Sequence, residues 1–148
     1  MRLNIEWDGA ADNNGDRKMG IGVWAYIGPK DSPNTLAEIA QYVGEGTSFK
    51  AEYYAAIEAF KFIRQYQKAL RDKFGITEVR MQNDSETVVK QINGEYKVSD
   101  ASIKILYDLV VLLRSQYSLN VTLIHVPREQ NTHADKLSKE GLAYGRAE

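Results

Sequence analysis

The chain has 148 residues, of which 43% are hydrophobic and 26% are charged, values typical of one globular domain. The absence of cysteine excludes a disulfide scaffold, a thiolate zinc site and a cysteine nucleophile; it fits a reducing compartment, so we expect a cytoplasmic location. The 19 basic and 20 acidic residues give a net charge of −1, which disfavours a partner held by an overall basic field. No apolar run is long enough to span a bilayer.

Hydrophobic periodicity and turn residues predict elements in the order βββαβααβα. In chain order they are strands over residues 3–8, 21–27 and 36–43, a helix over 48–73, a strand over 76–82, helices over 85–92 and 100–117, a strand over 119–126 and a helix over 131–144. The sequence has no linker-like segment, so we expect residues 1–148 to form a single domain. The element order predicts an α/β fold with a five-stranded mixed sheet, in which the later strands are parallel and helices flank the sheet.

Four carboxylates occupy comparable positions in this order. Asp8 and Asp84 each end a predicted strand, whereas Glu52 and Asp135 each lie in the first turns of a helix that follows a strand. Each position also has an ordinary explanation: an Asp-Gly turn, a helix cap, or a favourable interaction with the helix dipole. Glu52 fits such an explanation least well, because it is aligned with the apolar face of its helix, where a carboxylate needs a partner or a metal ion.

Taken together, the four acids predict one site at the carboxyl edge of the sheet, where folds of this kind bind their ligands. Carboxylates gathered without bases repel one another, and Mg²⁺ with its preference for oxygen ligands relieves that repulsion. Two such ions about 3.5–4 Å apart activate a water and stabilise the leaving oxygen of a phosphodiester. The pattern therefore indicates metal-dependent phosphoryl-transfer chemistry.

Four sequence blocks around these acids are similar to those of a known enzyme family. The blocks are Trp7–Ala10, Thr47–Tyr53, Asn83–Ser85 and Asn131–Asp135. In this order and on these elements, they resemble the type 1 ribonucleases H of the ribonuclease H-like superfamily, from residue 3 to about residue 142. The stretches 88–98 and 125–131 are most similar to the compact archaeal and plant-like branch of that family.

The resemblance implies an endonuclease that cleaves the RNA strand of RNA/DNA hybrids with two Mg²⁺ or Mn²⁺ ions and leaves 5′-phosphate and 3′-hydroxyl ends. It implies that Asp8 bridges both ions, that Glu52 and Asp84 join it at one ion, and that Asp135 joins it at the other. The implied substrate-binding residues are Gly9 at the RNA 2′-hydroxyl, Asn14 on the hybrid, Thr47 at a DNA-strand phosphate, and Ser48, Glu86 and Asn131. We expect a monomer with no hybrid-binding domain, no membrane contact and no obligate protein partner.

Several residues depart from the family pattern. Ser48 and Glu86 stand where many members carry Asn and Gln, and residues 92–103 lack the Lys/Arg-rich, Trp-bearing handle of some bacterial members, which predicts weaker and more salt-sensitive binding. His125 has the spacing from Asp135 of a mobile His found in many members, but the strand pattern favours a residue at the end of a strand. We expect His133 to be exposed in the first turn of the last helix.

Two other functions remain open at this point. Ser48 and Glu86 leave room for a DNA or junction nuclease of the same superfamily, and a nucleic-acid-binding module without chemistry is disfavoured because all four acids are present. Bound metal ions would offset the acids and leave a local basic path, for which the candidates near the motifs are Lys18, Lys50, Arg128 and Lys136.

Overall fold

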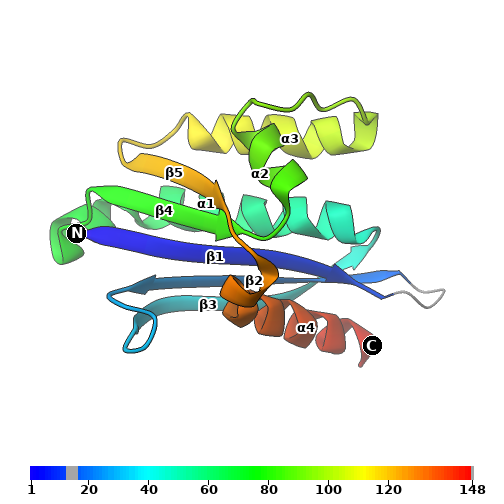
Figure 1. Cartoon of the computed structure of the whole chain (residues 1–148), viewed down its shortest axis with the longest axis horizontal. Helices are drawn as coiled ribbons and strands as arrows, with labels where there is room; N and C mark the ends of the chain where they lie inside the picture. Colours follow the sequence, from blue (N-terminus) through cyan, green and yellow to red (C-terminus); the bar gives the residue numbers. More distant parts are fainter. Residues whose placement is uncertain (13–16, 148) are drawn as a thin grey trace.

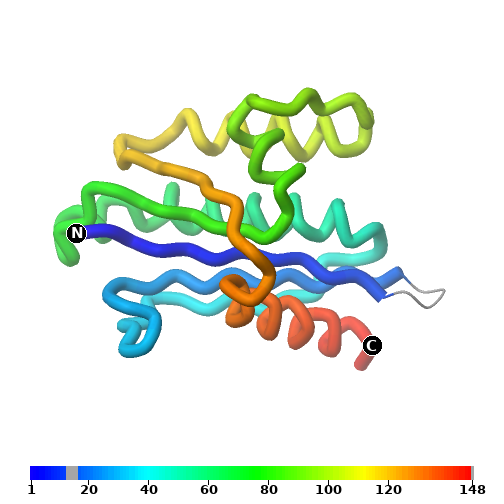
Figure 2. The backbone as a smooth tube through the Cα atoms, in the orientation of Figure 1, coloured from blue at the N-terminus to red at the C-terminus, as the bar shows by residue number. Residues whose placement is uncertain are grey.

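The computed structural model describes residues 1–12 and 17–147 and arranges them in layers around one sheet (Figure 1). The elements in chain order are β1 (Arg2–Ala11), β2 (Lys18–Ile27), β3 (Asn34–Glu45), α1 (Ser48–Phe74), β4 (Glu78–Asn83), α2 (Glu86–Ile92), α3 (Ala101–Arg114), β5 (Asn120–His125), a single 3-10 turn η1 (Arg128–Gln130) and α4 (Thr132–Arg146). Helix α1 covers one face of the sheet, α4 covers the other across β2 and β3, and α3 packs against α1 (Figures 1 and 2).

The predicted five-stranded mixed sheet is confirmed, with the strand order β3-β2-β1-β4-β5. Strands β1, β4 and β5 are parallel to one another, whereas β2 is antiparallel to both β1 and β3. This arrangement places the carboxyl ends of β1, β4 and β5 on the same side of the molecule. Ligand sites in such sheets form at that edge.

The expectation that the first strand ends at Asp8 is wrong. Strand β1 continues to Ala11, because Asp8 to Ala11 pair with Gly22 to Met19 of β2. Its parallel pairing with β4 stops earlier, at Glu6 and Gln82. The neighbouring strand β4 therefore ends while β1 runs on (Figure 1), and Asp8 lines a cleft.

Alternation along the strands divides the interior between the two faces of the sheet. Leu3, Ile5 and Trp7 are fully buried in the main core, to which α1 contributes many of the helical side chains. A smaller cluster of Trp24, Tyr26 and Leu137 lies under α4 on the opposite face. The helix can approach this closely because Gly22 has no side chain, since a Cβ there would overlap the backbone of α4.

Local capping sets the helix boundaries near the site. Thr47 caps α1 by accepting a hydrogen bond from the backbone N–H of Lys50, and Ser85 caps α2 by accepting one from Val88. Asp84 is therefore not the cap of α2, and its carboxylate is available for another role. No helix in the described part of the chain has both the length and the apolar character needed to cross a membrane.

Candidate active site

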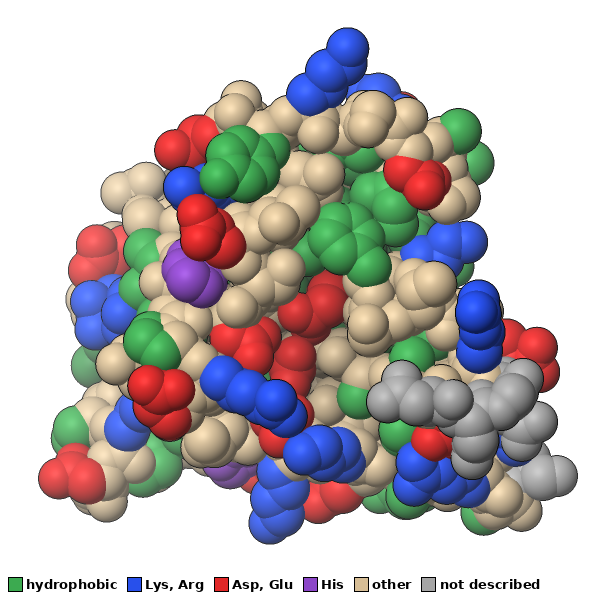
Figure 3. Space-filling model, turned by 45° about the vertical axis from the view of Figure 1, so that its right-hand side comes forward, with side chains coloured by type: hydrophobic (Ala, Val, Ile, Leu, Met, Phe, Trp, Pro, Cys, Tyr) green, Lys and Arg blue, Asp and Glu red, His purple; other side chains and the backbone are tan. Residues whose placement is uncertain are grey.

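Three of the four predicted acids meet where β1 and β4 separate. Asp8 of β1, Glu52 of α1 and Asp84 after β4 each place one carboxylate oxygen within 4.8 Å of the other two. Asp135, in the first turn of α4, lines the same cleft of about 550 Å³. The carboxylates gather in a hollow with Lys and Arg side chains along its rim (Figure 3). The structure thus brings all four predicted acids to one cleft, three of them as a cluster.

Gly9 brings α1 close enough for Glu52 to reach the opening. A Cβ at this position would overlap the backbone of Ala51 and Glu52, so only glycine allows the strand and the helix to touch here. The N–H of Gly9 donates to Oε1 of Glu52 at 2.5 Å and to Oδ1 of Asp8 at 3.0 Å. One backbone amide therefore holds two of the acids toward each other.

Two buried asparagines fix the backbone beneath the acids. The side-chain amides of Asn83 and Asn131 both donate to the carbonyl oxygen of Trp7, at 2.7 Å and 3.0 Å. Asn83 also lies 3.4 Å from Oε1 of Glu52 and accepts a hydrogen bond from the N–H of Ser85. These contacts connect β1, α1, the end of β4 and the start of α4, so the acids on these four elements are held in one arrangement.

Burial makes the charged state of the cluster costly. Asp8 is 5% exposed and Glu52 is 8% exposed. Burial, together with the neighbouring charges of Glu52 and Asp84, raises the pKa of Asp8 far above its ordinary range. Burial also raises the pKa of Glu52, to about 7, although hydrogen bonds to its carboxylate act in the opposite direction. The pKa of Asp84 is also raised, mainly by burial and in part by Asp135, although a backbone hydrogen bond and the charges of Arg128 and His125 act in the opposite direction.

The chain itself supplies little positive charge to these three acids. Within residues 1–12 and 17–147, none of Asp8, Glu52 and Asp84 forms an ion pair, whereas Asp135 pairs with Lys139 at 3.0 Å. Clustered carboxylate oxygens without a cation are the ligand set that Mg²⁺ or Mn²⁺ accepts. The donor set therefore fits a divalent metal ion, with Asp135 beside it at the same cleft.

The predicted substrate-binding residues fall into two groups. Gly9 and Ser48 line the cleft, and Thr47 is exposed beside it at the start of α1. Glu86, in contrast, forms an ion pair with Lys90 at 2.9 Å and does not line the cleft, and Asn131 is fully buried. Asn14 lies outside the described residues.

Arg128, Lys139, Phe49 and Ser85 also line the cleft. Of these, only Arg128 was among the sequence candidates, as part of the basic path. The spacing of Lys139 four residues after Asp135 on one helix was a signal that could have identified it. Lys18, another candidate for that path, donates instead to the carbonyl oxygen of Gly145.

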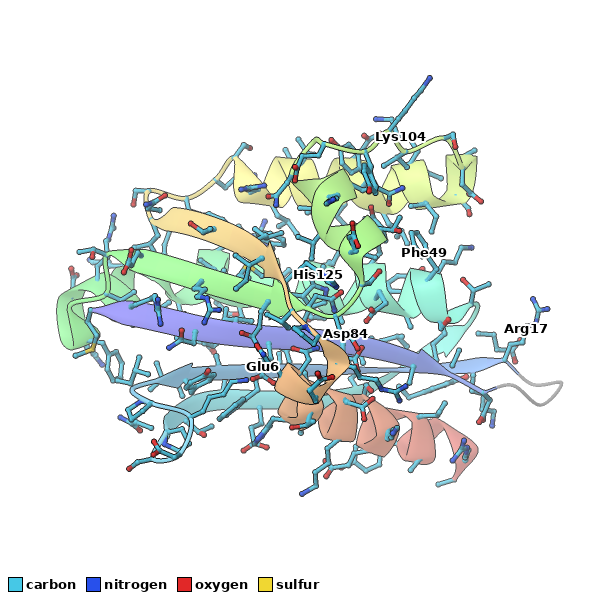
Figure 4. The ribbon with its side chains drawn as sticks, in the orientation of Figure 1. Glu6, Arg17, Phe49, Asp84, Lys104 and His125 are labelled. Atoms are coloured by element: carbon cyan, nitrogen blue, oxygen red, sulfur yellow. The ribbon has the colours of Figure 1, made fainter. Side chains whose placement is uncertain are left out.

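The two histidines lie in different surroundings. His125 is the last residue of β5, as its strand pattern predicts, and its side chain is exposed. It pairs with Asn83 of β4, the residue that precedes Asp84 (Figure 4). The expectation that His133 is simply an exposed helix residue is wrong. Its ring stacks on Trp24 with the centroids 3.9 Å apart, and its Nε2 lies 3.6 Å from Glu38, so it packs against the sheet away from the acids.

Comparisons with known proteins agree with this fold. A family model described as reverse transcriptase-like matches residues 31–141. The bifunctional protein Rv2228c of Mycobacterium tuberculosis is 33% identical over 143 residues, which are 96% of this chain and 36% of that protein. The ribonuclease HI of Halobacterium salinarum is 28% identical over 142 residues, 95% of this chain and 64% of that protein. This chain thus spans about a third of the mycobacterial protein.

Solved structures of ribonucleases H have the same fold as this chain. LC11-RNase H1, in a complex with an RNA/DNA hybrid, superimposes with a TM-score of 0.82 at 32% identity, over 97% of this chain and 99% of that one. The N-terminal RNase H domain of Rv2228c superimposes with a TM-score of 0.77 at 30% identity, over 96% and 99% of the two chains. The fold and the acidic cleft define a ribonuclease H-like domain. Within that class, this chain belongs to the reverse transcriptase-like family, among the type 1 ribonucleases H.

Proposed function

We propose that this chain is a metal-dependent endoribonuclease that hydrolyses the RNA strand of RNA/DNA hybrids and leaves 5′-phosphate and 3′-hydroxyl ends. The observation that carries the proposal is the meeting of Asp8, Glu52 and Asp84 within 4.8 Å at a solvent-open cleft, where no described residue forms an ion pair with them. The choice of substrate is supported by relatives that are named ribonucleases H, one of them bound to an RNA/DNA hybrid.

In this proposal, Asp8, Glu52, Asp84 and Asp135 hold two Mg²⁺ or Mn²⁺ ions. These residues would hold the ions, which would supply the Lewis acidity that lowers the pKa of an attacking water and offsets the charge on the leaving 3′-oxygen. Gly9 and Asn83 fix the carboxylate of Glu52 before substrate arrives, so little reorganisation is required. No side chain needs to act as the general base.

The basic residues of the cleft have a different role. Arg128 and Lys139 lie on the cleft with the acids, and their charges attract the phosphodiester backbone of a nucleic acid. Because all four acids come from the same chain, the proposed reaction requires no second copy, and we expect a monomer to be active. The low overall charge predicts weak hybrid binding in the absence of metal ions.

A matched cleavage assay tests the proposal. End-labelled RNA/DNA, RNA/RNA and DNA/DNA duplexes of one sequence are incubated with the chain in Mg²⁺, Mn²⁺ or EDTA. The proposal predicts cleavage of the RNA strand of the hybrid in either metal and none in EDTA. Asp84→Asn should abolish most of it, whereas Asp72→Asn, an exposed acid on α1, should leave it unchanged.

Other outcomes identify the alternatives. Cleavage of DNA/DNA without cleavage of the hybrid would show a DNA or junction nuclease instead. The absence of any turnover, with hybrid binding retained, would show a module that binds without chemistry. Wild-type rates in Asp84→Asn would contradict the assignment of the metal site.

A further inference from the structure

A polar pocket separate from the acidic cleft lies on the same face of the sheet as α4, beyond the area that the helix covers. Its volume is about 320 Å³, and it is lined by side chains from β1, β2, β4, the loop after β2 and η1. The residues that matter for its chemistry are Arg2, Asn4, Tyr26, Lys30, Arg80 and Gln130. Asn4 is opposite Tyr26 in β2 and opposite Arg80 in β4, so these three residues form one row across the sheet.

The charges around this pocket are unbalanced. Lys30 pairs with Glu6 at 2.6 Å, but neither Arg2 nor Arg80 forms an ion pair with any residue in the described ranges 1–12 and 17–147. Glu78, which is opposite Arg2 in the strand pairing, also lacks an ion pair within those ranges. Two arginines therefore line one recess without an ion-pair partner among the described residues. Burial and the charge of Glu6 raise the pKa of Tyr26, while Arg80 and Arg2 are close enough to act in the opposite direction.

The floor of the pocket holds an unsatisfied acceptor. The side chain of Asn4 is 7% exposed, and its Oδ1 has no hydrogen-bond partner among the described residues. A buried polar atom of this kind favours a ligand that brings its own donor. A phosphate monoester combines charge close to −2 at neutral pH with hydroxyl groups on the attached sugar, and guanidinium groups bind its oxygens in pairs.

This pocket is separate from the acidic cleft. Asn4 and Asp8 lie on the same face of β1 four residues apart, which corresponds to about 13 Å along the strand. The turn η1 lies between the two, since Arg128 lines the acidic cleft and Gln130 lines the polar pocket. The carbonyl oxygen of Gln130 accepts hydrogen bonds from both Lys30 and Gln82 at 2.6 Å, which fixes this side of the pocket.

We propose that this pocket binds the phosphate monoester of a nucleotide, with Arg2 and Arg80 on the phosphate oxygens and Asn4 accepting from a ligand hydroxyl. The ligand is either a free mononucleotide or the 5′-phosphate end of a short RNA, because both present the same group. The inference is independent of the cleavage activity, since it uses none of the four acids.

Calorimetric titration of the full chain in EDTA tests the proposal, with AMP, adenosine, and short RNA carrying either a 5′-phosphate or a 5′-hydroxyl as the probes. AMP or 5′-phosphorylated RNA should bind, and adenosine and 5′-hydroxyl RNA should bind at least about tenfold more weakly. Arg80→Gln should weaken binding by about tenfold or more, whereas Lys68→Gln, an exposed cation on α1, should leave it within about twofold. Binding of AMP alone would identify a mononucleotide site, and binding of the RNA alone would identify a site for RNA ends.

Arg2→Gln is the second variant, because Arg2 is exposed at the start of the chain and its loss does not disturb the strand pairing. This variant should bind the same phosphorylated probe several-fold more weakly than the wild type, with an unchanged melting temperature. Failure of both phosphorylated probes to bind, or equal affinity in Arg80→Gln and the wild type, would overturn the proposal. Equal binding of the 5′-hydroxyl RNA would overturn it as well.

Discussion

Two acids on the same strand illustrate different solutions to the burial of a carboxylate. Glu6 and Asp8 lie two residues apart on one face of β1, and they are 1% and 5% exposed. Glu6 binds Lys30 at 2.6 Å and lies within reach of the side-chain amide of Gln82 and the N–H of Ala134. Asp8, in contrast, faces Glu52 and Asp84 (Figure 4 labels Glu6 and Asp84). One acid has an internal cation, and the other lies among further acids.

The difference shows how a structural acid is distinguished from a candidate metal ligand. A buried carboxylate with its own cation is neutralised within the fold and requires nothing from outside. Buried carboxylates that face one another destabilise the fold unless a proton or an external cation joins them. By this criterion Glu6 belongs to the scaffold and Asp8 belongs to the site, although both are acidic and buried.

The largest expected effect is on the rate of hybrid cleavage, which should distinguish Asp8 from Glu6. Asp8→Asn should reduce hybrid cleavage in Mg²⁺ by on the order of 1000-fold, because it removes one of the clustered carboxylates that would hold the metal ions. Glu6→Gln should retain activity within about tenfold, because its partner is a lysine of the fold. Initial rates on a labelled hybrid at saturating Mg²⁺ measure both. Equal losses in the two variants would remove the distinction between them.

The next effect concerns stability. Lys30→Met leaves Glu6 buried without its cation and should lower the free energy of unfolding by about 2 kcal/mol, a value reduced by the partial exposure of Lys30. Urea denaturation at neutral pH measures this change. The double variant with Glu6→Gln should recover part of the loss, because the uncompensated charge is then gone. No loss in Lys30→Met would mean that Glu6 is not held by this pair.

Without metal ions, the free energy of unfolding should fall as the pH rises, because the pKa values of Asp8 and Glu52 are raised. A carboxyl with a folded pKa above its unfolded value of about 4 favours folding while protonated, and that contribution is lost as pH rises through the raised value. Burial raises the pKa of Glu52 to about 7 and that of Asp8 further. In EDTA the wild type should therefore lose stability between about pH 5 and about pH 8.

Asp8→Asn provides the comparison for that experiment. Without the charge of Asp8, stability should fall less over the same range, and at about pH 8 the variant should exceed the metal-free wild type by about 1 kcal/mol. Urea denaturation at both pH values gives the result. A variant that is less stable than the wild type at the higher pH would contradict repulsion within the cluster.

The smallest effect belongs to the acid with an exposed partner. Asp135 pairs with Lys139, whose side chain is 60% exposed, in an i,i+4 arrangement on α4. Lys139→Met should change the free energy of unfolding by less than about 0.5 kcal/mol, because exposed pairs of this kind contribute little. Thermal melts in EDTA test it. A loss of stability well above this value would mean that Asp135, like Glu6, depends on its lysine partner within the fold.

Much of the fold was predictable from local patterns. Period-two alternation and the helical spacing identified each strand and each α-helix, and the acids were placed at one edge because parallel strands end together. The end of β1 was not predictable from local sequence. Asp8-Gly9 is typical of a turn, but pairing with β2 carries the strand on to Ala11. The short turn η1 has no periodic signal of its own.

The roles of individual side chains depended on partners far away in the sequence. Nothing near Glu6 indicates that Lys30 neutralises it, and Asn131 appears in a motif but is used to hold the backbone of Trp7. Glu86 was predicted beside the hybrid but pairs with Lys90 one helical turn later. Residue type and spacing predicted which acids lie at one cleft, whereas the contacts of each side chain required the tertiary structure.

The most direct test of the central claim is the thermal stability of the wild type, Asp8→Asn and Glu6→Gln as Mg²⁺ is titrated in place of EDTA. A ligand that binds only the folded chain raises the melting temperature with its concentration. We predict a saturable rise for the wild type and for Glu6→Gln, and little or none for Asp8→Asn. An unchanged melting temperature in the wild type, or an equal rise in Asp8→Asn, would contradict the assignment of the three clustered carboxylates to a divalent metal ion.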